Sequence, residues 1–328
     1  MKILKYTLKK FIRMIILIVA VTISSFFLVT ASPIDPVQSY VESGVAVSSE
    51  QREEIADYWG LNDTKTERFK SWFTKAIKGD MGQSLIYRRP VLSVIGEKFK
   101  ASLVLMAMAW IISGVLGFTL GMGMGIFNGK PVDKIIKSVC IFLSSTPSFW
   151  LGMVFLIVFS VKLAWFPIGL SVPIGVSSEE VTIFQRMHHA ILPALTLGFA
   201  SFSNIALHTR VKIKEIMDSD YVLFAKARGE SFLNIINRHI IRNAIIPAIT
   251  LQFASISEIF GGSVLAEQVF SYTGLGQATV EAGIRGDIPL LLGIAIISSI
   301  FVFFGNFIAD ILYNTLDPRI RIGGIENE

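Results

Sequence analysis

The chain has 328 residues, of which 52% are hydrophobic and only 17% are charged, a composition more apolar than that of soluble domains and typical of a membrane protein. The formal net charge is +5, but the basic residues are divided among short segments between apolar stretches, so we expect no binding to nucleic acid. The single cysteine, Cys140, excludes a disulfide framework and cannot form a metal site by itself.

Six apolar stretches are long enough to cross a membrane as helices, because about 20 residues span roughly 30 Å of hydrocarbon. The fifth stretch is the least clean, since Glu258 interrupts it. We therefore expect an all-α membrane protein with six transmembrane helices, near residues 12–31, 101–127, 138–161, 190–209, 244–266 and 289–312.

The first stretch follows a basic N-terminus that resembles the start of a signal peptide. Its apolar run of about 20 residues is longer than the roughly 7–15 usual for a signal peptide, so we expect residues 1–31 to be an uncleaved transmembrane anchor. Lys and Arg are in excess before this helix, around Lys134 and in the loop 211–243, which marks all three regions as cytoplasmic. Both termini then lie in the cytoplasm, including a tail at residues 318–328.

Residues 32–100 form a large external segment in this topology. Ser48 or Ser49 can cap a helix that runs to Trp59, and Thr64 can begin a second helix. The second helix either packs against the outer ends of the transmembrane helices or lies in the membrane interface, and we favour packing. Its apolar side chains share one face and comprise Phe69, Trp72, Phe73, Ala76 and Ile77.

A strip of glycines marks the second transmembrane stretch. Gly117, Gly121 and Gly125 recur there at four-residue spacing. Such a strip is flat and lets another helix approach closely, so we expect it to be a helix-packing surface.

We expect no nucleotide or metal site in this chain. Gly129 and Lys130 suggest a phosphate-binding loop, but the first glycine of that motif is missing and Pro131 replaces its Ser or Thr. His188 and His189 are adjacent, and neighbouring side chains on a helix point about 100° apart, so they do not converge on one ion. We expect these histidines to have a structural role at the membrane interface.

Pro147 lies inside the third stretch, where it removes one backbone hydrogen bond that a neighbouring Ser or Thr can replace. We expect a kink at this position. A kinked helix near the axis of the bundle could act as a gate, with Pro147 and Ser148 along the translocation pathway. A kink that only improves packing agrees with the sequence equally well.

Glu258 is a carboxylate inside a transmembrane stretch, where a charge costs a few kcal/mol to insert. It should therefore face a water-filled cavity or a partner. One interpretation is that it lines the translocation pathway and meets a cationic or amino-terminal part of the cargo. The other is that it forms a hydrogen bond to a partner subunit, and the sequence leaves both open.

A polar, basic stretch from Asp218 to Pro247 separates the fourth and fifth transmembrane helices. Asp218 or Ser219 can cap a short helix, and Gly229 can end it in the left-handed conformation. Ser231 can cap a further helix that runs toward Pro247. The sequence therefore predicts a helix, a turn and a second helix on the cytoplasmic side.

The first helix of this loop has a face that a partner could approach closely. Ala225 and Ala227 are small, and Phe224 lies beside them. Lys226 and Arg228 flank the face with positive charge. A loop between two membrane helices has no core of its own in which to bury such a face, so we expect it to dock into another protein.

This loop resembles the coupling loop of binding-protein-dependent ABC transporter permeases, specifically the branch that imports dipeptides, oligopeptides and nickel. The family's loop begins Glu-Ala-Ala, whereas this chain has Leu223, Phe224 and Ala225. Any contact made by that Glu is therefore replaced or lost. The residues that match the family pattern are Ala225, Ala227, Gly229, Arg238, Asn243 and Pro247.

The resemblance covers nearly the whole chain. Residues 79–91 look like the same branch of permeases at the same place. Residues 267–276 closely resemble the family's E-x-V-F-x-x-x-G-L-G motif, and residues 309–319 resemble its terminal A-D-x-x-Y-x-x-L-D-P-R motif. Such long, ordered matches seldom arise by chance.

The resemblance implies one half of a channel in the cytoplasmic membrane, with residues 101–317 forming a five-helix permease core. It further implies a homologous second permease, an extracytoplasmic substrate-binding protein and two ATPases as partners. ATP and Mg²⁺ would bind to the ATPases, so this chain would be no enzyme and would hold no cofactor. The implied ATPase-docking residues are Tyr221, Phe224, Ala225, Lys226, Ala227, Arg228, Gly229 and Arg238.

The cargo stays open between peptides and nickel or a metal chelate. We favour peptides because the transmembrane stretches hold no cluster of metal ligands, although a chelated metal needs none. An ATP-independent secondary transporter or channel would need an inverted repeat or several intramembrane ionisable groups, and we find one clear intramembrane carboxylate. An intramembrane enzyme is excluded, since neither H-E-x-x-H nor G-x-S-x-G is present.

Overall fold

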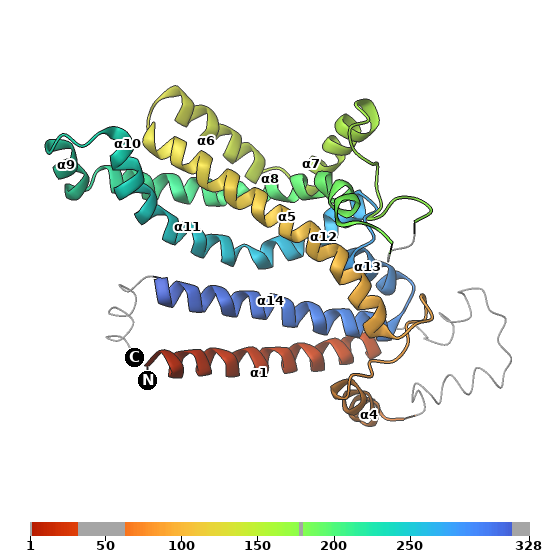
Figure 1. Ribbon diagram of the computed structural model, residues 1–328. Coiled ribbons are helices and arrows are strands. Elements are labelled where there is room, and N and C mark those ends of the chain that lie inside the picture. The colour runs from red at the N-terminus through yellow and green to blue at the C-terminus, as the bar shows by residue number, and fades with distance from the viewer. Residues whose placement is uncertain (1, 32–62, 177–179, 317–328) are drawn as a thin grey trace. The chain divides into compact units, whose positions relative to one another are not determined.

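The computed structural model of this chain describes residues 2–31, 63–176 and 180–316 (Figure 1). Within these residues the chain is helical and forms no strand, apart from an isolated antiparallel bridge between Gln83 and Pro90. The all-α fold class is therefore confirmed. The helices are α1 (Lys2–Ala31), α4 (Lys65–Ile77), α5 (Val91–Ile126), α6 (Pro131–Ser144), α7 (Ser148–Phe155), η1 (Leu156–Lys162), α8 (Ile183–Met217), α9 (Asp220–Ala227), α10 (Phe232–Ile235), η2 (Ile236–Ile241), α11 (Arg242–Ala254), α12 (Ile256–Val269), α13 (Leu275–Ile284) and α14 (Ile288–Leu316), of which η1 and η2 are π-helical.

Four of the described helices, α1, α5, α8 and α14, are long and apolar enough to cross a membrane. Two bent pairs also qualify by length and composition, α6 with α7 and η1, and the α10–α11 run with α12. The total is therefore four spans, or up to six if each bent pair counts as one. The six stretches expected from the sequence fall on these same elements.

The third stretch is not the single kinked helix that the sequence suggested. Its two halves meet at 105°, with Pro147 directly before α7. A residue before proline avoids the helical conformation, so α6 ends close to Thr146. The Thr146 hydroxyl donates to the Phe142 carbonyl at 2.8 Å, and the Ser144 hydroxyl donates to a carbonyl three residues earlier at 3.0 Å. Side-chain hydroxyls thus bond to backbone carbonyls in the last turn of α6, where the helix ends completely and does not continue into α7.

The chain divides into two compact units. The first contains residues 1–102 and 273–304, and the second contains residues 103–272 and 305–328. Each unit is described separately below.

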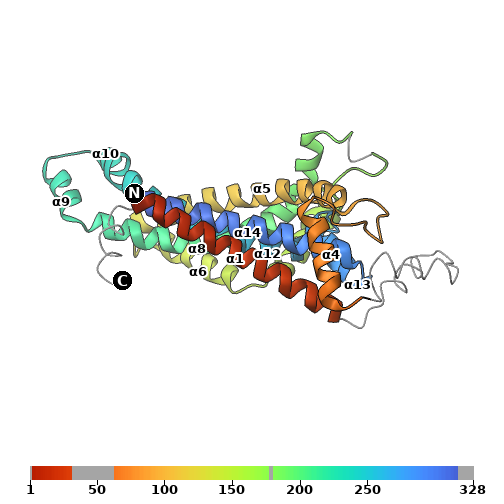
Figure 2. The same ribbon diagram turned by 90° about the horizontal axis from the view of Figure 1, so that it is seen from below.

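In the first unit, α4 packs against the C-terminal part of α1, which it crosses (Figure 2). Thr64 and Glu67 form a capping box at the start of α4, as the sequence predicted for Thr64. The ring of Phe26 lies 5.1 Å from that of Phe69 and 5.5 Å from that of Trp72, measured between centroids. The apolar face of α4 therefore packs on a transmembrane helix. The helix expected from Ser48 to Trp59 lies outside the described residues.

A buried carboxylate fixes the loop before α5 in the same unit. Asp287 is fully buried, and its Oδ2 accepts hydrogen bonds from the Ser84 hydroxyl at 2.5 Å and the Ile86 N–H at 3.0 Å. Its Oδ1 accepts from the Leu290 N–H at 3.1 Å. Nearby, the Tyr87 hydroxyl donates to Glu281 at 2.9 Å. These bonds join residues 84–87 to the chain just before α14.

In the second unit, α8 packs against α5 along the glycine strip. A Cβ added at Gly121 would lie 2.6 Å from the Ala206 carbonyl oxygen. A Cβ at Gly117 or Gly125 would lie 2.7 Å from an isoleucine side chain of α8. Any larger residue would therefore push α8 away, so glycine is needed for this approach.

Candidate functional site

The loop between α8 and α11 folds as a helix, a turn and a second helix. In both views α9 and α10 lie beyond the C-terminal end of α8 (Figure 1 and Figure 2). Gly229 has a φ of +76°, the left-handed conformation expected for the residue that ends α9. The Ser231 side chain accepts from the Asn234 N–H and so caps α10. Ser219 stands at the N-cap position of α9, but its hydroxyl donates to the Ile216 carbonyl instead of capping the helix.

The expectation that this loop has no core of its own is wrong. Val222 and Ala225 of α9 are buried in a hydrophobic cluster with residues from the end of α8 and from η2. Ala225 is 2% exposed. Its small side chain faces the interior of the loop, so it offers no contact surface to a partner. The other buried members of this cluster, which we call the loop core, are Ile213, Ile216, Ile235, Ile240 and Ala244.

The loop also carries large apolar side chains that the described chain does not cover. Leu223 is 65% exposed and Phe224 is 64% exposed. Leu233, beyond the turn, is 70% exposed. Single exposed apolar residues are common on proteins, but several on one short polar loop are typical of an interaction surface. We call this set the exposed face; it comprises Tyr221, Leu223, Phe224, Phe232 and Leu233.

Positive charge borders the exposed face, as the sequence predicted. The Arg228 guanidinium lies 5.9 Å from the centre of the Phe224 ring. Lys226, Ala227 and Arg238 are also exposed. A partner that covers the apolar residues would therefore meet several cations at the edge of the contact.

A contact that the sequence analysis missed joins the two ends of the loop. The His239 Nε2 lies 3.3 Å from a carboxylate oxygen of Glu230, and the His239 ring lies 6.1 Å from that of Tyr221. The Asn243 side chain donates to the His239 carbonyl at 2.6 Å. His239 therefore links α9, the turn and η2. Its position in the sequence gave no signal of this role, because the contact depends on how the loop closes.

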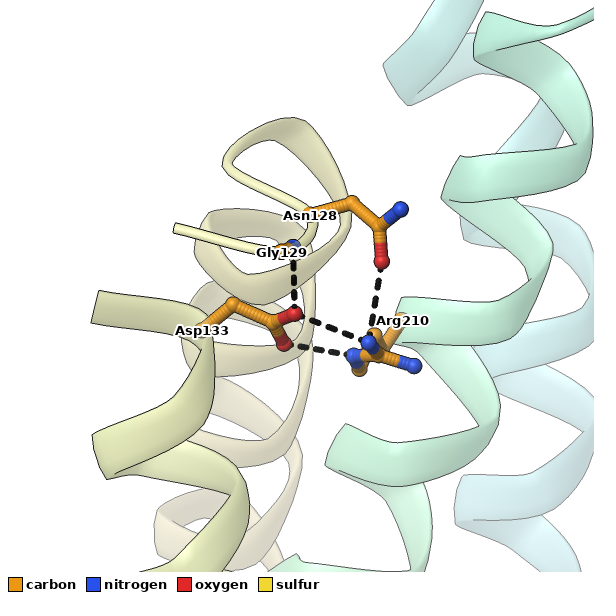
Figure 3. Close-up of polar contacts among 4 residues, drawn as sticks. All are labelled: Asn128, Gly129, Asp133 and Arg210. Carbon is orange, nitrogen blue, oxygen red and sulfur yellow. Dashed lines mark hydrogen bonds and ion pairs between the residues drawn. The ribbon is translucent and has the colours of Figure 1, made fainter. Parts of the chain in front are cut away.

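A second missed contact ties the segment between α5 and α6, and the start of α6, to α8 (Figure 3). The Arg210 guanidinium donates to both carboxylate oxygens of Asp133, at 2.6 and 2.8 Å, and to the Asn128 side chain at 2.9 Å. The Gly129 N–H donates to the same carboxylate at 2.8 Å. The side chain of Asp133 is 3% exposed and that of Arg210 is 19% exposed. Asp133 and Arg210 lie beside the two stretches around Lys134 and at 211–243 in which Lys and Arg are in excess, and this excess was the only signal in the sequence.

Glu258 lies in the first turn of α12, just after the 47° bend that separates α12 from α11. It is exposed, and it forms no ion pair in the part of the chain that the structure describes. The bend is held from α5, because the Trp110 indole donates to the Gln252 carbonyl at 2.7 Å and the Gln252 amide donates back at 2.5 Å. An exposed carboxylate here agrees with either role considered for it.

The remaining candidates lie apart from this loop. Pro147 and Ser148 stand at the junction between α6 and α7. His189 Nδ1 lies 3.1 Å from the Gly169 carbonyl oxygen, which gives this histidine a structural contact. Among the described residues no three His, Cys, Asp or Glu side chains are grouped closely enough to hold a metal ion.

Comparison with known proteins points to one family. A family model described as "binding-protein-dependent transport system inner membrane component" matches residues 117–322. The oligopeptide transport system permease protein AppB of Bacillus subtilis is 32% identical over 321 residues, which cover 96% of this chain and 99% of AppB. The glutathione transport system permease protein GsiC of Escherichia coli K12 is 29% identical, over 97% of this chain and 99% of GsiC. A putative peptide permease protein of Brucella suis is 28% identical with the same coverage.

Proposed function

Because the chain belongs to the family of binding-protein-dependent transport system inner membrane components, we propose that it is the permease subunit of an ATP-driven ABC importer for peptides. The relatives named above are permeases for oligopeptides, peptides or glutathione, which favours peptides over nickel or a metal chelate. The apolar helices agree with a protein that spans the membrane. The excess of Lys and Arg in the loops supports the cytoplasmic membrane with both termini inside.

The chain needs several partners for this function. A homologous second permease completes the pathway, and an extracytoplasmic substrate-binding protein delivers the peptide. Two cytoplasmic ATPases bind ATP and Mg²⁺, so this chain carries no catalytic or cofactor-binding residues. The observation that carries the proposal is the exposed face, which is apolar, bordered by cations and displayed on a loop predicted to be cytoplasmic.

The docking contacts differ from those first expected. Leu223 and Phe224 occupy the positions where the family has Glu and Ala, and both are exposed. Burial of apolar surface therefore takes the place of a contact through the missing carboxylate. Ala225 and Gly229 shape the loop, whereas Tyr221, Phe224 and Arg228 are placed to touch the ATPase.

Transport follows from the connection between this loop and the membrane helices. The loop core joins α9 to the end of α8 and to Phe118 and Met122 of α5. When ATP closes the two ATPases, the docked helix moves and carries the ends of these helices with it. The pathway then changes the side to which it opens. Such coupling requires that ATP and the loaded binding protein favour different states of the permease.

Substitution of the exposed face tests this proposal. We expect Leu223→Ser combined with Phe224→Ser to reduce copurification of the ATPases at least tenfold, because each side chain contributes about 1–2 kcal/mol when buried at a contact. Uptake of a labelled oligopeptide into proteoliposomes should fall with it. Asp220→Asn is the control, since Asp220 is exposed on the same helix and belongs neither to the exposed face nor to the implied docking residues.

The proposal fails if the double variant inserts normally, binds the ATPases as tightly as the parent protein and imports peptide at the same rate. Membrane insertion is checked separately by resistance to extraction with carbonate. This check separates a lost contact from a lost fold.

A further inference from the structure

The first unit contains a cavity of about 160 Å³ where α4 packs beside the C-terminal end of α1 and the N-terminal end of α14. Phe26, Trp72 and Leu292 give it an apolar wall. Arg68 and Lys75 contribute cations, whereas Asp63 and Asp80 contribute carboxylates. A cavity with an apolar wall and both signs of charge favours a ligand that is itself amphipathic.

Arg68 is a cation in need of a counterion. Its side chain is half-buried, and burial lowers the pKa of its guanidinium. It forms no ion pair and no hydrogen bond with any residue in the part of the chain that the structure describes, the two nearby carboxylates included. A charge that has lost water without gaining a partner is unfavourable, so an anion in this cavity would be bound strongly.

A second unused donor lies on the same face of α4. The indole Nε1 of Trp72 is buried and has no hydrogen-bond partner among the described residues. Residues four apart on a helix are neighbours, so Arg68 and Trp72 lie one turn from each other. Both are donors and both line the cavity, which suits one acceptor group with several oxygens.

The cavity lies at the level where a membrane has its headgroups. Thr30 lines it from the last turn of α1, and Ile288 and Pro289 line it from the first turn of α14. Both helices are long and apolar enough to span a membrane, so these residues mark the ends of two spans. On α1, Ile23 is 39% exposed and Phe27 is 37% exposed, and each lies one turn before a residue that lines the cavity, so they offer an apolar surface beside it.

We propose that this cavity binds the phosphate of a membrane phospholipid, held by Arg68 and Trp72, with the acyl chains lying along α1. Asp63 and Asp80 at the same cavity favour a headgroup that also carries an amine. A zwitterionic phospholipid such as phosphatidylethanolamine fits this arrangement of charges. The site is on the outer side of the membrane, because the N-terminus of α1 is assigned to the cytoplasm.

The test measures lipid bound to the purified full-length transporter. The complex is extracted from membranes, and native mass spectrometry counts phosphatidylethanolamine per complex for the parent protein and for Arg68→Gln and Trp72→Phe. We expect Arg68→Gln to lose at least tenfold in occupancy. Trp72→Phe, which keeps a ring and removes the N–H, should lose a few-fold. Lys70→Gln is the matched control, since Lys70 is exposed on the same helix and does not line the cavity.

Thermal unfolding gives a second readout that does not depend on transport. Phosphatidylethanolamine added to delipidated complex should raise the unfolding temperature of the parent protein and of Lys70→Gln, but not that of Arg68→Gln, because a ligand stabilises only the form that binds it. Equal occupancy and equal stabilisation in Arg68→Gln would overturn the proposal. If millimolar inorganic phosphate displaces the lipid or gives the same stabilisation, the cavity is a site for free anions and the lipid proposal is wrong.

Discussion

Two buried carboxylates in different units are held in opposite ways. Asp133, whose side chain is 3% exposed, receives two hydrogen bonds from the Arg210 guanidinium and one from a backbone N–H (Figure 3). Asp287, fully buried, receives its hydrogen bonds from the Ser84 hydroxyl and from backbone N–H groups. No cationic side chain pairs with it in the described residues.

The difference shows what each contact can tolerate. A buried ion pair is balanced only while both charges are present, so the loss of either one leaves the other buried alone. A carboxylate held by neutral donors has no paired cation, so its replacement by a neutral group leaves no other charge buried alone. Neutralising Asp133 should therefore lower the free energy of unfolding more than neutralising Asp287 does.

The largest effect is expected for Asp133→Asn. This change leaves the partly buried guanidinium of Arg210 without its counterion, which should lower the free energy of unfolding by up to about 3–5 kcal/mol, the cost of breaking a buried pair. Unfolding in detergent, followed by tryptophan fluorescence, measures it. Glu215→Gln removes the exposed ion pair with Lys212 on α8 and should cost less than about 1 kcal/mol. If the two variants unfold alike, the pair between Asp133 and Arg210 contributes no more than a surface contact.

A smaller effect is expected for Asp287→Asn. Both carboxylate oxygens accept from N–H groups, so an amide places one of its own N–H groups against a donor. We expect a loss of about 1–3 kcal/mol, the usual cost of one unsatisfied buried group. The same unfolding assay applies. A loss larger than that of Asp133→Asn would reverse the comparison.

The smallest effect is a pH dependence of stability expected from Asp287. Burial raises the pKa of Asp287 above its usual value, although its hydrogen bonds oppose the shift. Its contribution to stability is therefore greatest below the unfolded-state pKa of about 4 and decreases as the pH rises through the folded-state pKa. The difference in unfolding temperature between the parent protein and Asp287→Asn should grow as the pH falls from 7 to 4. A difference that shrinks on acidification would show that the pKa shift has the opposite sign.

Much of the fold could be predicted because it depends on local pattern. The apolar lengths predicted the elements that span the membrane, the spacing of Gly117, Gly121 and Gly125 predicted a close helix approach, and Thr64 predicted the start of α4. The angle at Pro147 could not be predicted, since a proline marks where backbone bonding fails but not how far the two halves turn.

The candidate site was predicted less completely, because its key contacts join distant residues. Asp133 and Arg210 are 77 positions apart, and a charge count over two loops cannot match one acid to one base. Ala225 was placed on the outer surface because small residues suit a contact face. Its true neighbours come from α8 and η2, which the local pattern does not show.

The loop core has a mechanical consequence. Because α9 shares one hydrophobic cluster with the end of α8, with η2 and with α11, a force applied to α9 cannot be absorbed by bending at the links between these segments. The loop should therefore move as a rigid body, so that a displacement of α9 is transmitted almost undiminished to the ends of α8 and α11.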